Sequence, residues 1–163
     1  MIAGGAYAGK RRYLRSRESH VHWHSAYDGK QWSDWQTAWE QAIATSSILV
    51  LEGLELWIAE ALKQGHSADA VRKEYRAVLH ELKQLEDVRR EEANDSASHD
   101  HHVAILMLEM GRGIVPMQAN ERALRDTAGW LQQDAASLSS EAVYIWHGLP
   151  RVMKQTLVNP ELD

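Results

Sequence analysis

Two short runs of apolar residues, 47–51 and 103–108, stand out along the chain. Neither run alternates between apolar and polar positions, and each is followed by a glutamate, Glu52 or Glu109. Continuous, partly β-branched runs of this length are typical of strands buried on both faces, as in parallel sheets. We therefore expect two buried strands here, with a short strand before Gly4 and a last strand at 141–146.

Histidines alternate with other residues early in the chain and predict a strand of a different kind. His20, His22 and His24 fall on one face of this strand, and Val21 and Trp23 fall on the other. Three histidines at this spacing suit either a metal site or the exposed face of an edge strand.

Apolar residues recur at three- and four-residue steps between the strands, which predicts helices. The longest helix carries an apolar seam that fits burial against its own sheet or, alternatively, a partner helix. Strands separated by helices favour α/β layers around a mostly parallel sheet, and residues 1–163 read as a single domain. Trp57 and Trp146 are expected in its core. The helices are expected at 10–18, 35–43, 54–64, 67–92 and 120–138.

Composition limits the classes of protein that fit the chain. At 163 residues it has the length of one domain, and without cysteine it has no disulfides, thiolate ligands or thiol nucleophiles. A net charge of −5 gives no support to a nucleic-acid partner. The most apolar stretch, 48–62, is too short for a membrane span and contains three glutamates. With no secretory signal either, we expect a cytoplasmic protein without nucleic-acid or membrane partners.

A glycine-rich loop follows the first strand and precedes the first helix. Gly4, Gly9 and Lys10 have the spacing of a Walker A loop, in which backbone N–H groups point at phosphates and the lysine reaches them. The next position normally supplies a hydroxyl to Mg²⁺, but here it is Arg11. A phosphate site and a plain glycine-rich turn both remain open. The expected nucleotide-binding residues are Gly4, Gly5, Ala6, Tyr7, Ala8, Gly9, Lys10 and Arg11.

Two acidic residues end the buried strands near this loop. Glu52 holds the position where P-loop enzymes bind Mg²⁺, and the alternative is a helix N-terminal acid favoured by the dipole. Glu109 faces the same crevice in a parallel sheet, because ligands gather at the carboxyl ends of strands. Gly111 and Gly113 are expected to form a tight loop there. We therefore expect Glu52 as a catalytic metal ligand and the other three residues beside the nucleotide.

Four blocks of sequence, in order, resemble one enzyme family. Residues 4–10 resemble the Gly-Gly-Ala-Arg-Ser-Gly-Lys loop of the adenosylcobinamide kinase/adenosylcobinamide-phosphate guanylyltransferases. Residues 109–116 are similar to the family's Glu-Val-Gly-x-Gly-Ile-Val-Pro signature, which is the most specific match. Residues 51–57 resemble its Leu-Asp/Glu-Cys-Leu-Thr-Leu-Trp segment, and residues 125–133 resemble its Arg-Asp-x-x-Gly-x-x-Asn-Gln helix.

The resemblance implies a P-loop NTPase-like, three-layer α/β fold and a homotrimer. It implies that the protein uses GTP or ATP, with Mg²⁺, to phosphorylate adenosylcobinamide. It also implies that the protein then transfers GMP from GTP to the product through a guanylylated histidine. The partners are then a nucleotide and a corrinoid, and the pathway is cobalamin (vitamin B12) biosynthesis. Lys10 and Glu52 are the residues expected to act in catalysis.

The chain departs from the family pattern at two places. Arg11 stands where the family has serine. The family's segment that carries the nucleophilic histidine has no counterpart in this sequence. His24 is the best remaining candidate, because a neutral imidazole can attack a phosphate at pH 7. Two hypotheses follow: a bifunctional kinase/guanylyltransferase, or a non-catalytic nucleotide- or corrinoid-binding relative that has lost the Mg²⁺ ligand and the guanylylated histidine.

Overall fold

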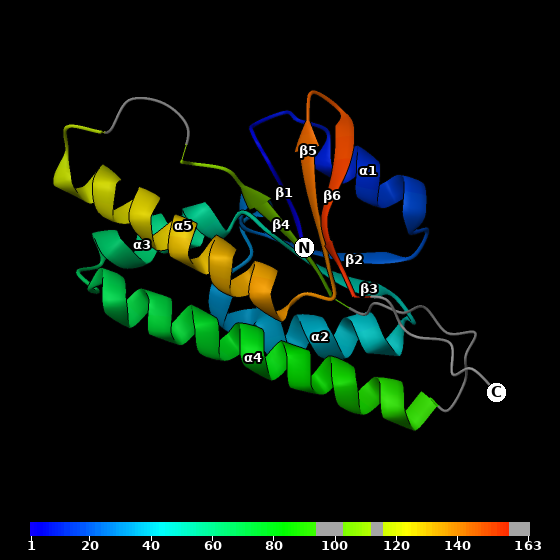
Figure 1. Ribbon diagram of the computed structural model, residues 1–163. Helices are drawn as coiled ribbons and strands as arrows, with labels where there is room; N and C mark the ends of the chain where they lie inside the picture. The colour runs from blue at the N-terminus through cyan, green and yellow to red at the C-terminus, as the bar shows by residue number, and fades with distance from the viewer. Residues whose placement is uncertain (94–102, 112–115, 157–163) are drawn as a thin grey trace.

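The computed structural model describes residues 1–93, 103–111 and 116–156, and its centre is a six-stranded sheet. The strand order is β2-β3-β4-β1-β5-β6 (Figure 1). The neighbouring strands pair in parallel, except that β6 pairs antiparallel with β5. The strands are β1 Ile2–Gly4, β2 Val21–Ser25, β3 Ile48–Glu52, β4 Val103–Leu108, β5 Glu141–Trp146 and β6 Leu149–Gln155.

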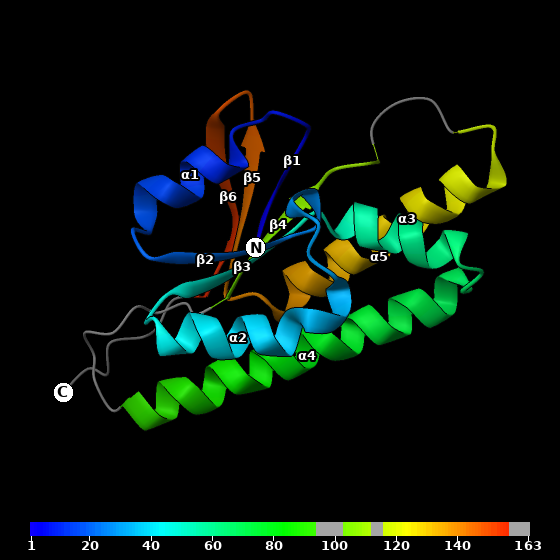
Figure 2. The ribbon, with the colours of Figure 1, turned by 180° about the vertical axis from the view of Figure 1, so that it is seen from behind.

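Helices cover the two faces of the sheet unequally (Figures 1 and 2). Among the described elements, α1 (Lys10–Arg17) covers one face alone, and four longer helices cover the other. This arrangement confirms the predicted α/β fold with a mostly parallel sheet, and it is consistent with a P-loop NTPase-like architecture. The four helices are α2 Trp35–Ala44, α3 Leu54–Lys63, α4 Ala68–Ala93 and α5 Ala119–Leu138, and the short 3-10 turns η1 Ala26–Asp28 and η2 Trp32–Asp34 precede α2.

The central strand β3 shows why its sequence has no alternation. Ile48 and Val50 join the cluster under α1, and Leu49 and Leu51 join the larger cluster under the four helices. All four side chains are buried. A strand between two helical layers must be apolar on both faces, as the continuous run predicted.

Most of the apolar seam of α4 is buried within the chain, although Val88, toward the end of the helix, is 53% exposed. Tyr75 is buried and stacks on Trp32 with ring centroids 4.2 Å apart, and Arg72 forms an ion pair with Asp134 of α5 at 3.0 Å. The seam therefore packs against its own domain. No helix among the described residues is both long and apolar enough to cross a membrane.

The end of the chain differs from expectation. The sequence pattern predicts no strand after Trp146, but β6 follows and forms an exposed edge of the sheet. Trp57 is buried as predicted, whereas the prediction for Trp146 is wrong: its side chain ends β5 and is 57% exposed. An edge strand has partners on one side only, so its residues need not carry the apolar pattern of a buried strand.

Candidate functional site

The loop of residues 4–10 turns from β1 into α1 at the carboxyl edge of the sheet. Gly4 lies so close to β5 that a Cβ there would stand 2.4 Å from the Ile145 carbonyl oxygen. Tyr7 and Gly9 have left-handed backbones, with φ of 55° and 100°. Tyr7 is fully exposed, so its ring projects from the loop into solvent. The loop has the tight, glycine-dependent course that phosphate-binding loops need.

Lys10 begins α1 and turns its ammonium back over the loop. Its Nζ donates to the carbonyl oxygens of Gly4 at 2.9 Å and Gly5 at 2.8 Å. Burial lowers the pKa of Lys10, while the negative charges of Glu55 and Glu52 oppose that shift. An ammonium has three N–H donors, so one remains for an anion.

Arg11 and Glu52 form the closest ion pair of the site. Arg11 Nε lies 2.9 Å from both carboxylate oxygens, and its Nη2 lies 2.5 Å from Oε2. Ser25 donates its hydroxyl to the same Oε2 at 3.2 Å. The Glu52 side chain is 8% exposed, and the hydrogen bonds to it raise the pKa of Arg11. The guanidinium also lies 4.9 Å from the ring centroid of Trp23, which fixes its position from the other side.

These contacts do not fit the Mg²⁺ expected at Glu52. Both oxygens of the carboxylate already accept hydrogen bonds from a cation. The residue after Lys10 brings a positive charge where the ion needs a hydroxyl oxygen. Arg11 therefore places a cation of the chain itself against Glu52, beside the loop of residues 4–10.

Glu109 lies on the same edge of the sheet, immediately beside the loop. Its N–H donates to the Gly4 carbonyl at 3.0 Å, and its carboxylate accepts the hydroxyl of Tyr144 at 2.5 Å. This confirms that the segment after β4 and the phosphate loop share one edge. Arg125 of α5 donates to the Gly111 carbonyl at 2.8 Å and ties that segment to the helix. Gly113 lies outside the described residues.

His24 is placed differently from the residues above. It lies on β2, which β3 and β4 separate from β1, and it is 3% exposed. Its Nε2 donates to the Gln31 carbonyl at 2.8 Å, and its ring stacks on Trp57 at 5.5 Å. Burial lowers its pKa. This shift favours the neutral imidazole that a nucleophile needs, but the ring is enclosed and is not brought to the loop.

The described residues contain no cluster of three metal-ligating side chains. The alternating histidines of β2 therefore do not converge on an ion. His99, His101 and His102 lie in a polar stretch that the sequence favours as a solvated loop rather than a metal cluster, and they lie outside the described residues.

Sequence reasoning missed a second carboxylate contact near Lys10. Tyr27 of η1 donates its hydroxyl to Glu55 in a short hydrogen bond, and burial raises the pKa of Tyr27. Gly53 makes this corner possible, because its φ is 87° and a Cβ there would stand 2.9 Å from the Cβ of Ala26. No local pattern links these segments, so the pair could not be found from the sequence.

Residues 147–150 were expected to close the last strand, but the hairpin that they form with β6 and its contact with the loop of residues 4–10 were missed, although a signal for the hairpin exists. Gly148 donates its N–H to the Ala8 carbonyl at 2.9 Å, which joins this turn to the phosphate loop. His147 and Gly148 both have left-handed backbones, with φ of 48° and 81°. A residue pair ending in glycine between two β-compatible segments is a recognised signal for a two-residue hairpin.

A family model matches most of the chain. Residues 12–153 match the family described as cobinamide kinase / cobinamide phosphate guanyltransferase. The match begins directly after Arg11 and does not include the loop of residues 4–10. Any role of that loop therefore has to be argued from its own sequence and geometry. No curated protein matches the chain.

Proposed function

The chain belongs to the cobinamide kinase / cobinamide phosphate guanyltransferase family, and on this basis we propose that it binds GTP or ATP at residues 4–11 and phosphorylates cobinamide in cobalamin biosynthesis. The family match covers most of the chain, from α1 to β6. It gives the pathway and the two substrate classes, a nucleotide and a corrinoid. The geometry of the site supports one of the family's two reactions better than the other.

One observation carries the nucleotide proposal: the position of the Lys10 ammonium over a tightly turned loop. Two of its N–H groups are held by the Gly4 and Gly5 carbonyls. A phosphate oxygen would take the third and would replace the water that burial removes from this cation. The N-terminus of α1 points its free N–H groups at the same place.

Phosphoryl transfer is the better supported of the two family reactions. It depends on positioning and charge stabilisation rather than on a nucleophile supplied by the protein. Guanylyl transfer through a histidine needs an open imidazole beside the phosphates, and His24 is buried with its Nε2 bound to Gln31. We therefore assign the loop to nucleotide binding and kinase chemistry.

A second candidate function rests on the ion pair of Arg11 and Glu52. Both oxygens of the Glu52 carboxylate are engaged by Arg11, so the loop can bind phosphates without a metal and without catalysing a reaction. The second candidate is therefore a non-catalytic relative that binds a nucleotide or a corrinoid.

Calorimetric titration of GTP and ATP, together with an assay for phosphorylation of cobinamide, tests both candidates. Lys10→Ala should weaken nucleotide affinity by roughly 1.5–3 kcal/mol, the contribution of a charge-assisted hydrogen bond. Lys63→Ala, at the exposed far end of α3, is the matched control and should bind as wild type does. Turnover abolished by Lys10→Ala supports the kinase, and tight binding without turnover supports the non-catalytic relative. If neither nucleotide binds, the kinase and the nucleotide-binding relative are both refuted, and only a relative that binds a corrinoid is left, which a titration with cobinamide tests.

A further inference from the structure

A buried carboxylate at the phosphate-loop edge of the sheet has no part in the proposed function. Glu55 lies in the first turn of α3, directly after β3, and is 7% exposed. Among the described residues, the hydrogen bond that its carboxylate accepts comes from the hydroxyl of Tyr27. The family segment that residues 51–57 resemble has threonine at this position. The carboxylate is therefore a feature of this chain, kept although its burial costs free energy.

The turn η1 places Tyr27 against this carboxylate. Ser25 ends β2, and its Oγ accepts the Tyr27 N–H at 3.2 Å, which begins the turn. Gly53 leaves room for the ring, because a Cβ on Gly53 would stand 3.3 Å from the Tyr27 Cε2 atom. Tyr27 itself is 52% exposed. The pair therefore has a buried end, Glu55, and an end that is open to solvent, Tyr27.

A series of contacts joins this pair to the phosphate loop. The Ser25 hydroxyl that receives the Tyr27 N–H donates to Glu52 at 3.2 Å. Glu52 is bound in turn by Arg11, the residue directly after the loop lysine. The negative charge of Glu55 acts on that lysine as well, where it opposes the fall in pKa that burial causes. The pair and the loop therefore belong to one connected group of side chains at the carboxyl edge of the sheet.

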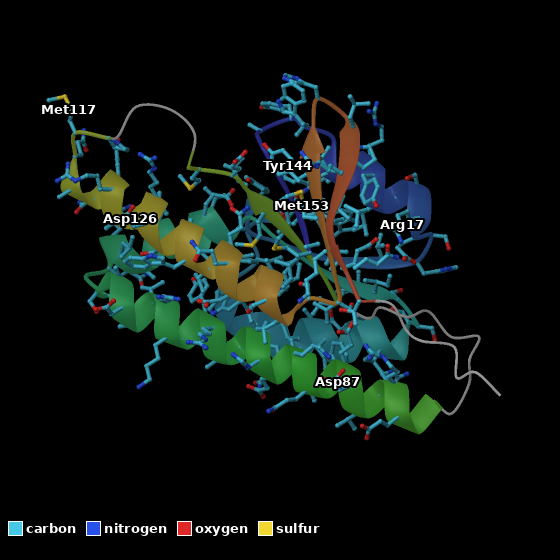
Figure 3. The ribbon with its side chains drawn as sticks, viewed as in Figure 1. Arg17, Asp87, Met117, Asp126, Tyr144 and Met153 are labelled. Carbon is cyan, nitrogen blue, oxygen red and sulfur yellow. The ribbon has the colours of Figure 1, made fainter. Side chains whose placement is uncertain are left out.

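The other carboxylates at this edge are engaged differently. Both oxygens of Glu52 accept hydrogen bonds from Arg11. Glu109 accepts the hydroxyl of Tyr144, which lies on β5, on the other side of β1 from β3 (Figure 3). The carboxylate charges that act on the loop lysine are those of Glu55 and Glu52. Of these two, Glu55 is the one that no cation occupies among the described residues.

We propose that Tyr27 and Glu55 take the proton from the hydroxyl that the kinase phosphorylates, an inference that rests on the proposed function. The acceptor hydroxyl donates to the Tyr27 oxygen, whose own proton lies in the hydrogen bond to Glu55. As the acceptor oxygen bonds to the γ-phosphorus, the bond from that phosphorus to the bridging oxygen breaks, and the nucleoside diphosphate leaves. The acceptor's proton passes to Tyr27, and the proton of Tyr27 passes to Glu55, which later releases it to water.

The exposure of the two side chains suits a relay through the phenol. Because Glu55 is 7% exposed, an acceptor as large as a corrinoid reaches it only through Tyr27, which is half exposed. Burial and the hydrogen bond to Glu55 raise the pKa of Tyr27. The phenol therefore holds its proton between turnovers and can donate it to the carboxylate when the acceptor arrives.

Steady-state phosphorylation of cobinamide, with nucleotide affinity and Tm measured alongside, tests the relay. Tyr27→Phe and Glu55→Gln keep the shape of each side chain, and each should lower kcat by about 100-fold or more, as loss of acid–base catalysis does. The Kd of the nucleotide should stay unchanged. Glu55→Thr should be as slow as Glu55→Gln, because threonine cannot take up the proton. The double variant should be no slower than the slower single variant, because both changes remove the same path.

Two substitutions outside the site serve as matched controls. Tyr13→Phe removes a hydroxyl that accepts a hydrogen bond from Arg17 on α1, and Glu60→Gln removes an exposed carboxylate from α3 itself. Both variants should turn over as wild type does.

Failure of the relay and failure of the proposed function give different results. If Tyr27→Phe or Glu55→Gln keeps the wild-type kcat, the relay is refuted while the kinase stands. If kcat and nucleotide affinity fall together, the pair shapes the loop and the inference is wrong. If the effects of the two substitutions multiply in the double variant, the residues act separately, which also refutes the relay. If wild type phosphorylates no cobinamide, the kinase proposal fails and the relay fails with it.

Discussion

Replacing Arg11 by serine tests the internal cation most directly, because it removes the ion pair and supplies the hydroxyl that the loop lacks. Glu52 would remain in its site, 8% exposed, and among the described residues the Ser25 hydroxyl would be its remaining hydrogen-bond donor. Removing one partner of a buried ion pair costs about 3–5 kcal/mol. The Arg11 side chain is 42% exposed, so water recovers much of that loss, and we expect a decrease in the free energy of unfolding of about 1–2 kcal/mol.

For a domain of this size, that decrease lowers Tm by roughly 2–8 °C. Magnesium should restore part of the loss in Arg11→Ser, because the freed carboxylate and the new hydroxyl are both oxygen ligands. Arg17→Ser is the matched control, because it breaks the ion pair with Glu141, which lies away from the loop. The Arg17 side chain is 42% exposed, as the Arg11 side chain is. The Tm of Arg17→Ser should fall without any response to Mg²⁺.

Nucleotide binding gives the second measurement. Wild type should bind GTP equally well in Mg²⁺ and in a chelator, because its cation is part of the chain. Arg11→Ser should bind more tightly with Mg²⁺ than without it, by on the order of tenfold, the equivalent of one charge-assisted contact. If wild-type binding requires Mg²⁺ and the mutation leaves that requirement unchanged, Arg11 does not replace the metal and the reasoning is wrong.

Two further predictions concern stability. Gly4→Ala should lower the free energy of unfolding by about 3 kcal/mol, because its Cβ would stand 2.4 Å from the Ile145 carbonyl oxygen. Gly129→Ala lies in the helix α5, where a Cβ would meet nothing within 4 Å, and should raise the free energy of unfolding by roughly 0.5–1 kcal/mol. Chemical denaturation measures both. Burial lowers the pKa of His24 below its usual 6.5, so the unfolded chain takes up its proton first and stability should fall as pH drops below about 6.5. Thermal melts from pH 8 to 5 should show a smaller fall for His24→Gln than for wild type, and an undiminished fall for the exposed-site control His80→Gln.

Much of the fold could be predicted because each buried strand carries its own evidence. The run at β3 is apolar on both faces since helices cover both, and the glycines of the phosphate loop mark a turn that other residues resist. The exposed strand β6 carries no such evidence. Its register with β5 shifts between Ala142 and Val143, and no apolar period marks which residues face the sheet.

The candidate site could be predicted only where its residues end a strand or belong to a motif. Glu109 meets the loop because parallel strands end together. The bond between Arg11 and Glu52 joins residues from α1 and β3 and depends on where a long side chain turns. His24 shows the opposite limit, since alternation placed it on a face of the strand but could not show that Trp57 and Gln31 close over that face.

The position of β1 in the middle of the sheet has a consequence for the order of folding. β1 is the first strand to be synthesised, but it pairs with β4 and β5. Ile2 therefore cannot pair until Leu106 and Val143 have been synthesised. The phosphate loop is held in turn by Glu109 and Gly148, which are synthesised late. Closing such long loops is slow and entropically costly. A chain shortened before β5 therefore lacks the Gly148 contact that holds the loop of residues 4–10. If the loop binds a nucleotide as proposed, such a shortened chain should not bind it.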